Sequence, residues 1–206
     1  YQNRPDEALR MLSEAEPVIA GRFGAKSFQF MSLQTETLAV ATRKGDYARA
    51  FGIAERLHEA VRAQYGEQHP QTAKMLFTWG FVAHEAERDD QATGLLTAAC
   101  AALEKALGIK SALTQNCLVT RAFLDLASGE LARAQDLLGQ IDVGVLRAFR
   151  AVDADPEVIR GGAQGLIDLS KGDASGRKKV LAAIEARDRT VQPKDRFYRL
   201  LKAAVN

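Results

Sequence analysis

Proline, long apolar runs and targeting signals are scarce or missing in this sequence. Five of its 206 residues are proline, while alanine and leucine are abundant, and both facts favour helix. No apolar run approaches the roughly 20 residues that a bilayer-crossing helix needs, and no signal peptide opens the chain. We therefore expect no membrane insertion within these residues. Because the chain begins at Tyr1 rather than at methionine, we expect it to be a piece of a longer protein.

The sequence also lacks the patterns that carry common enzyme chemistry. His58 and His84 are each followed by glutamate, as in zinc proteases, but neither has a second histidine four residues later. The glycine-rich stretch 161–165 follows no strand pattern, and no serine or cysteine has the context of a nucleophile elbow. We therefore predict no catalytic residue, no metal site, no cofactor and no enzymatic activity.

Charge is balanced overall but uneven along the chain. The 28 Lys/Arg and 26 Asp/Glu residues leave a net charge of +2. From Lys171 to Asn206 there are ten basic and four acidic residues, a net of +6, so the preceding 170 residues carry 18 against 22, a net of −4. A basic tail can meet nucleic acid or anionic lipid. Without aromatic interleaving or a DNA-reading motif, we predict a solvated helical face and no nucleic-acid partner.

A repeat of 42 residues organises the chain. Small residues recur at this spacing, and apolar residues follow them four and seven positions later, on the same face of a helix. The small residues are Ala8, Ala50, Ala92, Ala134 and Gly176. Glycines that follow a bulky apolar residue form a second series, Gly24, Gly66 and Gly108, and Gly45 and Gly129 lie two periods apart. Each unit is therefore predicted to be two antiparallel helices with glycine at the turns.

The predicted fold is all-α, a solenoid of antiparallel helix hairpins in which each unit buries its apolar face against the next. We expect repeats over residues 1–141, the first one incomplete, and a degenerate repeat with capping helices over 142–206 in the same solenoid. The stretch 142–156 is expected to be irregular. Helices are predicted at residues 5–22, 27–44, 46–64, 70–87, 89–106, 111–128, 130–141, 157–170, 174–189 and 194–204.

Several turns resemble those of a known repeat family. Residues 65–73 (YGEQHPQTA) carry the Gly-x-x-His-Pro-x-Thr-Ala turn that separates the 42-residue units of kinesin-light-chain-type tetratricopeptide repeats (TPRs). Residues 45–50 (GDYARA) and 129–134 (GELARA) resemble the turn inside each unit of that family, and residues 3–9 fit the same slot. The resemblance covers about residues 3–141 and weakens beyond them.

The resemblance implies a right-handed superhelix whose first helices line a concave groove that binds an extended or helical peptide. The implied ligand is a protein segment with apolar side chains and some acidic character, because phenylalanines would lie between basic edges. The groove residues carried over are Ser32, Thr35, Arg43, Lys74, Phe77, Phe81, His84, Asn116 and Phe123. For Phe77 and Phe81 the alternative is packing against neighbouring helices.

Two departures from the family pattern bear on this groove. Arg121 and Asp125 fall where the family buries residues, so the register of that helix could be offset by one. The positions that bind a carboxylate in chaperone-binding relatives hold other residues here, and that specialised function is not predicted. Those positions are Thr35, Ala39, Thr78, Asn116 and Thr120.

The two cysteines lie on adjacent predicted helices. Cys100 and Cys117 are nearly equidistant from the turn near Ile109, so antiparallel packing would bring them to the same height. A disulfide between them would imply an oxidising compartment. The alternative is two buried thiols that act as small apolar residues.

We predict a protein-interaction domain, the sensor or partner-binding arm of a larger regulatory protein. By resemblance, such repeats in bacteria often follow a membrane-spanning Ser/Thr kinase or a winged-helix transcription regulator. This favours a periplasmic location, with the cytoplasm as the alternative. The alternative function is a self-association module, in which Phe197, Tyr198, Leu200 and Leu201 form an apolar seam on the last helix and join copies into a homo-oligomer.

Overall fold

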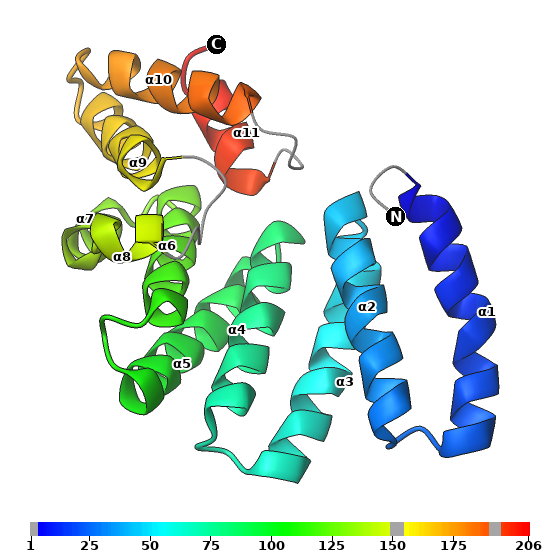
Figure 1. The fold of residues 1–206 in the computed structure, drawn as a ribbon. Helices are drawn as coiled ribbons and strands as arrows, with labels where there is room; N and C mark the ends of the chain where they lie inside the picture. The colour runs from blue at the N-terminus through cyan, green and yellow to red at the C-terminus, as the bar shows by residue number, and fades with distance from the viewer. Residues whose placement is uncertain (1–3, 149–154, 190–194) are drawn as a thin grey trace.

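The computed structural model describes residues 4–148, 155–189 and 195–206, and the regular elements in these ranges are α-helices (Figure 1). The helices are α1 (Pro5–Phe23), α2 (Phe28–Lys44), α3 (Tyr47–Tyr65), α4 (Pro70–Glu85), α5 (Asp89–Leu107), α6 (Ala112–Ala127), α7 (Leu131–Gln140), α8 (Val143–Ala148), α9 (Pro156–Ser170), α10 (Gly176–Asp188) and α11 (Arg196–Ala203).

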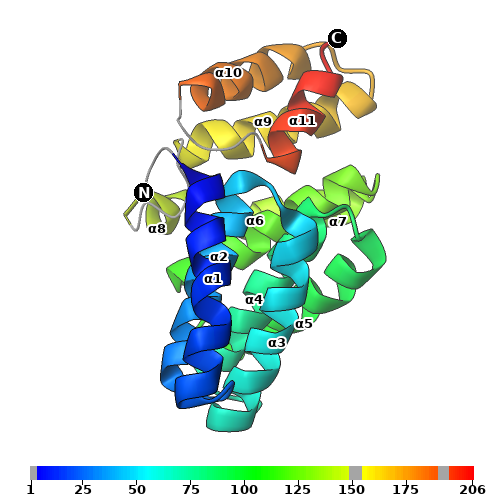
Figure 2. The same ribbon diagram turned by 90° about the vertical axis from the view of Figure 1, so that its right-hand side faces the viewer.

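Neighbouring helices pair into hairpins that stack in a curved row (Figure 1). The pairs are α2 with α3, α4 with α5, α6 with α7, and α9 with α10, while α1 packs on α2 as the second helix of a unit. Helix α4 also contacts α6, and α6 contacts α9, so first helices adjoin one another. Figure 2 shows the second helices α3, α5 and α7 together on one side. This arrangement confirms the predicted all-α superhelical solenoid.

The small residues of the 42-residue repeat lie where helices cross closely. Ala50, Ala92 and Ala134 have no exposed surface. A Cβ added at Gly176 would lie 2.4 Å from the carbonyl oxygen of Gly165, so α9 and α10 meet backbone to backbone. The repeat thus continues into the α9–α10 hairpin because a small residue is needed at each crossing.

Glycines end the second helices as the repeat predicts. Gly24, Gly66 and Gly108 follow α1, α3 and α5 with φ angles of +87°, +87° and +80°, a region that side chains with a Cβ rarely adopt. The N–H of Gly66 still donates to the carbonyl oxygen of Arg62, at 2.9 Å. Each glycine therefore closes the last helical turn and redirects the chain toward the next unit.

Helix ends lie within two residues of their predicted positions. One short helix, α8, was not predicted, because six residues carry too little periodicity to be read from a sequence. Residues 149–154 of the predicted irregular stretch lie outside the described residues. So do residue 3 and residue 194, where the last helix was predicted to begin.

Helix α6 carries a charged pair at inward positions. Nε of Arg121 lies 3.1 Å from Oδ1 of Asp125, and the two side chains are 12% and 4% exposed. The guanidinium also donates to the carbonyl oxygen of Thr93 on α5, at 3.3 Å. The helix needs no offset in register, because the buried positions are filled by two charges that compensate each other.

Buried apolar side chains form one continuous core along the stack, from Ala8 on α1 to Leu201 on α11. The described helices include none that is long and apolar enough to cross a membrane.

Candidate partner-binding surface

The residues predicted to line the groove fall into three groups by exposure. The exposed ones lie on α2 and α4 and are Ser32, Thr35, Arg43 and Lys74. The half-buried ones are Phe81, Asn116 and Phe123. Phe77 and His84 are buried. Polar side chains on the first helices therefore remain open, while the predicted apolar anchors are partly or fully covered.

Phe77 is a core residue. Its side chain belongs to the continuous apolar core and is 7% exposed, whereas Phe81, one helical turn later, is half-buried. A ligand cannot reach a ring that is enclosed between helices. The packing alternative therefore describes Phe77, and we remove it from the proposed ligand contacts.

His84 is covered by the end of the chain. It is 2% exposed, and its Nδ1 lies 3.4 Å from the guanidinium of Arg196 on α11. Burial, and then the positive charge of Arg196, lower the pKa of His84 to about 4, so the imidazole is neutral near pH 7. His84 is consequently an internal contact of the chain in this structure and is not open to a ligand.

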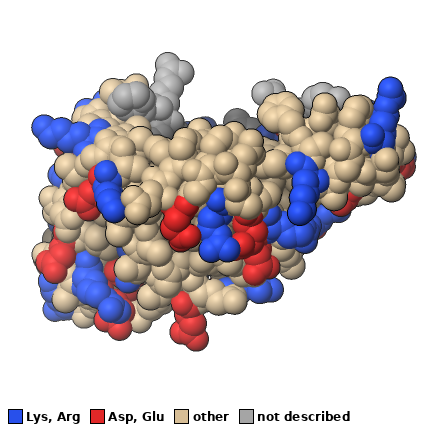
Figure 3. Space-filling model, turned by 90° about the horizontal axis from the view of Figure 1, so that it is seen from below, with Lys and Arg blue, Asp and Glu red and all other residues tan. Residues whose placement is uncertain are grey.

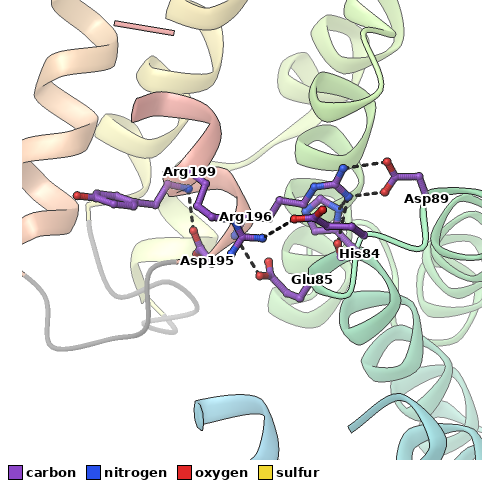
Figure 4. A network of polar contacts seen from close by, with 8 residues as sticks. His84, Glu85, Asp89, Asp195, Arg196 and Arg199 are labelled. Carbon is purple, nitrogen blue, oxygen red and sulfur yellow. Dashed lines mark hydrogen bonds and ion pairs between the residues drawn. The ribbon is translucent and has the colours of Figure 1, made fainter. Parts of the chain in front are cut away.

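Arg196 links the start of α11 to the junction of α4 and α5 (Figure 4). Its guanidinium donates to both carboxylate oxygens of Asp89, one of them at 2.8 Å, and to the carbonyl oxygen of His84 at 3.1 Å. Its backbone N–H donates to Oε2 of Glu85 at 3.0 Å. We call His84, Glu85 and Asp89 the acidic notch. A guanidinium that donates to both oxygens of one carboxylate makes one of the stronger polar contacts in proteins.

Glu85 is a buried carboxylate within the acidic notch. Burial raises the pKa of Glu85 to about 6, and the nearby carboxylate of Asp195 contributes to this rise. The N–H of Arg196 and the hydroxyl of Tyr47 donate to Glu85 and partly oppose this shift. Burial, together with the negative charge of Glu85, raises the pKa of Tyr47. A change in the charge of Glu85 on α4 therefore alters its contacts with Tyr47 on α3 and with Arg196 on α11.

Helix α11 also covers Phe123. The ring of Phe197 stacks parallel to that of Phe123, with ring centroids 3.7 Å apart. Phe197 is 2% exposed and Leu201 has no exposed surface, while Tyr198 and Leu200 are half-buried. The apolar seam that was predicted to join copies of the chain is thus largely used within one chain.

The basic tail meets acidic groups of the same chain. Besides Arg196, Nη2 of Arg199 lies 3.2 Å from Glu87, and Nζ of Lys179 lies 2.6 Å from Asp168. Most of the described basic side chains of the tail, Arg199 and Lys179 included, are exposed, as predicted for a solvated face, and these pairs also join the tail to acidic groups of the same chain. On the face that Figure 3 shows, positive and negative side chains are interspersed.

Cys100 on α5 and Cys117 on α6 are joined as a disulfide in this structure, with Cα atoms 5.5 Å apart. The two positions lie at the same height on packed antiparallel helices, as their distances from the intervening turn suggested. The bond ties the second helix of one unit to the first helix of the next.

The remaining histidine-containing motif has a structural explanation. His58 is buried and lies against Trp79, with the two rings tilted and their centroids 5.6 Å apart, and burial lowers the pKa of His58. Within the described residues no group of three or more His, Cys, Asp or Glu side chains could hold a metal ion.

Sequence reasoning missed Glu85, Asp89 and Arg196 as a connected site. The available signal was the opposite net charge of the tail and of the body, which indicates attraction but not which residues meet. A contact between residues 107 positions apart depends on how the stack curves, and no local pattern encodes that curvature.

No protein-family model and no curated protein sequence matches this chain. Solved structures do resemble it. A Podosopora anserina chain described as a putative kinesin light chain with nearly identical TPR-like repeats superposes with a TM-score of 0.67 and 15% identity, over 93% of this chain and 92% of that one. A variant of that protein gives the same TM-score and identity over 99% of this chain and 89% of that chain. BtubC (BKLC) from P. vanneervenii superposes with a TM-score of 0.59 and 12% identity, over 99% of this chain and 78% of that one. At such identities the likeness concerns the fold alone, which is that of TPR-like helical repeat solenoids.

Proposed function

We propose that this chain is a protein-interaction domain that binds a segment of a partner protein along its first helices, α2, α4 and α6. The single observation that carries the proposal is the exposure of polar side chains on α2 and α4, among them Lys74, which lies two helical turns before the half-buried Phe81 on α4. Such a mixture of apolar and polar groups on a rigid repeat scaffold suits recognition of a peptide. Proteins of this fold generally mediate protein–protein interaction.

The chemistry of this surface sets the expected ligand. Arg43 and Lys74 are exposed and form no ion pair among the described residues, so they would attract acidic side chains of the partner. Phe81 and the neighbouring apolar surface would take an apolar side chain. The role of the chain as one arm of a larger regulatory protein stays a prediction from the resemblance.

A random peptide display library selected on the immobilised chain tests the proposal. We expect the selected peptides to bind the Lys74→Glu variant about tenfold more weakly than the wild type, a loss of about 1.4 kcal/mol. Lys105→Glu is the matched control, because Lys105 is an exposed lysine on the second helix α5. Selected peptides that are weakened by Lys105→Glu and not by Lys74→Glu would contradict the proposal, as would the failure of any peptide to be enriched.

A further inference from the structure

The contact of α11 with the acidic notch joins parts of the solenoid that are not neighbouring units. In stacked repeats each unit normally touches only its neighbours. Here Arg196 and Phe197 reach α4, α5 and α6 from the far side of the α9–α10 hairpin. The end of the chain therefore occupies a surface that belongs to units earlier in the stack.

The surface beneath α11 has a defined chemistry. It offers the carboxylate of Asp89 and the carbonyl oxygen of His84 to a guanidinium, the carboxylate of Glu85 to a free backbone N–H, and the ring of Phe123 to an aromatic side chain. A free N–H at the first position of a segment is a property of a helix N-terminus. The surface thus fits the start of a helix that carries arginine followed by an aromatic residue.

Helix α11 is itself built like a bound segment. It spans eight residues, Arg196–Ala203, and a helix of that length is marginal unless it packs on something else. Asp195 caps it by accepting a hydrogen bond from the N–H of Tyr198, at 2.9 Å. Much of its attachment to the acidic notch is charge-assisted, through the guanidinium of Arg196.

We propose that the acidic notch, together with Phe123, is a recognition site for a helical segment that begins with an arginine and an aromatic residue, and that α11 is its intrachain occupant. A partner segment of this chemistry competes with α11 for the site. This inference rests on the proposed function, because it names one class of partner and the internal element that regulates access to the same surface.

The test uses the 206-residue chain and a fluorescent peptide of residues 195–206. Three chains are titrated with this peptide: the wild type, Arg196→Ala and the control Arg189→Ala. In the wild type Arg189 is exposed and pairs with Glu185 on α10. We expect Arg196→Ala to bind the peptide about tenfold more tightly than wild type and the control, because its own helix occupies the site less often. A peptide carrying the Arg196→Ala change should bind about tenfold more weakly, and adding Asp89→Ala to the Arg196→Ala chain should remove the gain.

Equal binding of the peptide to wild type and to a folded Arg196→Ala chain would overturn the proposal. Equal affinity of the two peptides would also overturn it, since the guanidinium would then not be recognised. If Arg196→Ala does not fold, Arg196→Lys replaces it, because lysine keeps the charge without the paired hydrogen bonds. If neither variant folds, the contact is part of the fold that no partner can replace, and the proposal is wrong.

Failure of this inference can be separated from failure of the proposed function. Display-selected peptides that depend on Lys74 and not on Asp89 would support the partner-binding function while rejecting the acidic notch as a site for partners.

Discussion

The ring of Phe197 on α11 lies parallel to the ring of Phe123 on α6, with centroids 3.7 Å apart. Phe123 was expected to meet a partner, and in this structure it meets the chain's own last helix. Together with the pair formed by Arg196 and Asp89, this stack ties the end of the chain to the middle of the solenoid.

Removal of the Arg196 side chain should destabilise the fold. The side chain of Arg196 is 12% exposed and its guanidinium pairs with both oxygens of Asp89, so Arg196→Ala is expected to lower the free energy of unfolding by about 1–3 kcal/mol. Urea denaturation measures this loss. A double-mutant cycle with Asp89→Ala should give a coupling energy of about 1–2 kcal/mol. Arg189→Ala, at an exposed pair, should stay within about 0.5 kcal/mol of wild type, and a similar loss there would argue against a special role for Arg196.

The pH dependence of stability should expose two opposed titrations in the acidic notch. Because the folded pKa of Glu85 is raised to about 6, folding binds a proton there, and stability falls as pH rises from about 4.5 to 6. Because the folded pKa of His84 is lowered to about 4, stability from that group rises between about pH 4 and 6.5. In the wild type the two effects oppose each other between about pH 4.5 and 6.

Glu85→Gln should remove the contribution of Glu85 to the pH dependence of stability. Between pH 4.5 and 7 the variant is expected to gain about 2 kcal/mol of unfolding free energy relative to wild type, since glutamine does not ionise. Chemical denaturation at constant ionic strength across this range measures the difference. Parallel curves for the two proteins would show that Glu85 is not buried beneath α11.

Reduction of the bond between Cys100 and Cys117 should destabilise the chain. The cysteines are 17 positions apart, and closing a loop of this size stabilises a fold by about 3 kcal/mol in the chain-entropy model. Denaturation with and without dithiothreitol measures the effect. The Cys100→Ala/Cys117→Ala chain should not respond to the reductant, and a wild type that also fails to respond would show that the two thiols are not joined.

Two glycines on α9 should respond in opposite directions to alanine. A Cβ at Gly165 would lie 2.7 Å from the carbonyl oxygen of Gly176, so Gly165→Ala is expected to cost about 1–3 kcal/mol. A Cβ at Gly161 meets nothing within 4 Å, so Gly161→Ala should stabilise the helix by about 0.5–1 kcal/mol. Thermal or urea unfolding of both variants gives the comparison, and a stabilised Gly165→Ala chain would refute the close crossing of α9 and α10.

Much of the fold could be predicted from the sequence because the repeat is a local signal copied several times. Alanine at Ala50, Ala92 and Ala134 and glycine at the turns fix helix crossings and helix ends without reference to distant residues. Helix α8 was missed because a helix of six residues shows no full period.

The candidate site was less predictable, for two physical reasons. Phe77 and Phe81 lie one helical turn apart, and a small rotation of α4 decides which ring faces the core and which remains accessible. The acidic notch depends on the curvature of the whole stack, which brings Arg196 to Asp89. The charges of the two segments indicated attraction, but not its place.

Hydrogen–deuterium exchange of the full chain, with and without a display-selected peptide, tests the central claim most directly. If a partner segment lies along the first helices, bound peptide should slow amide exchange in α2 and α4 and leave α3 and α5 nearly unchanged. Slowing confined to α3, α5 and α7, or to the turns at residues 24–27 and 66–69, would place the binding surface elsewhere and contradict the account.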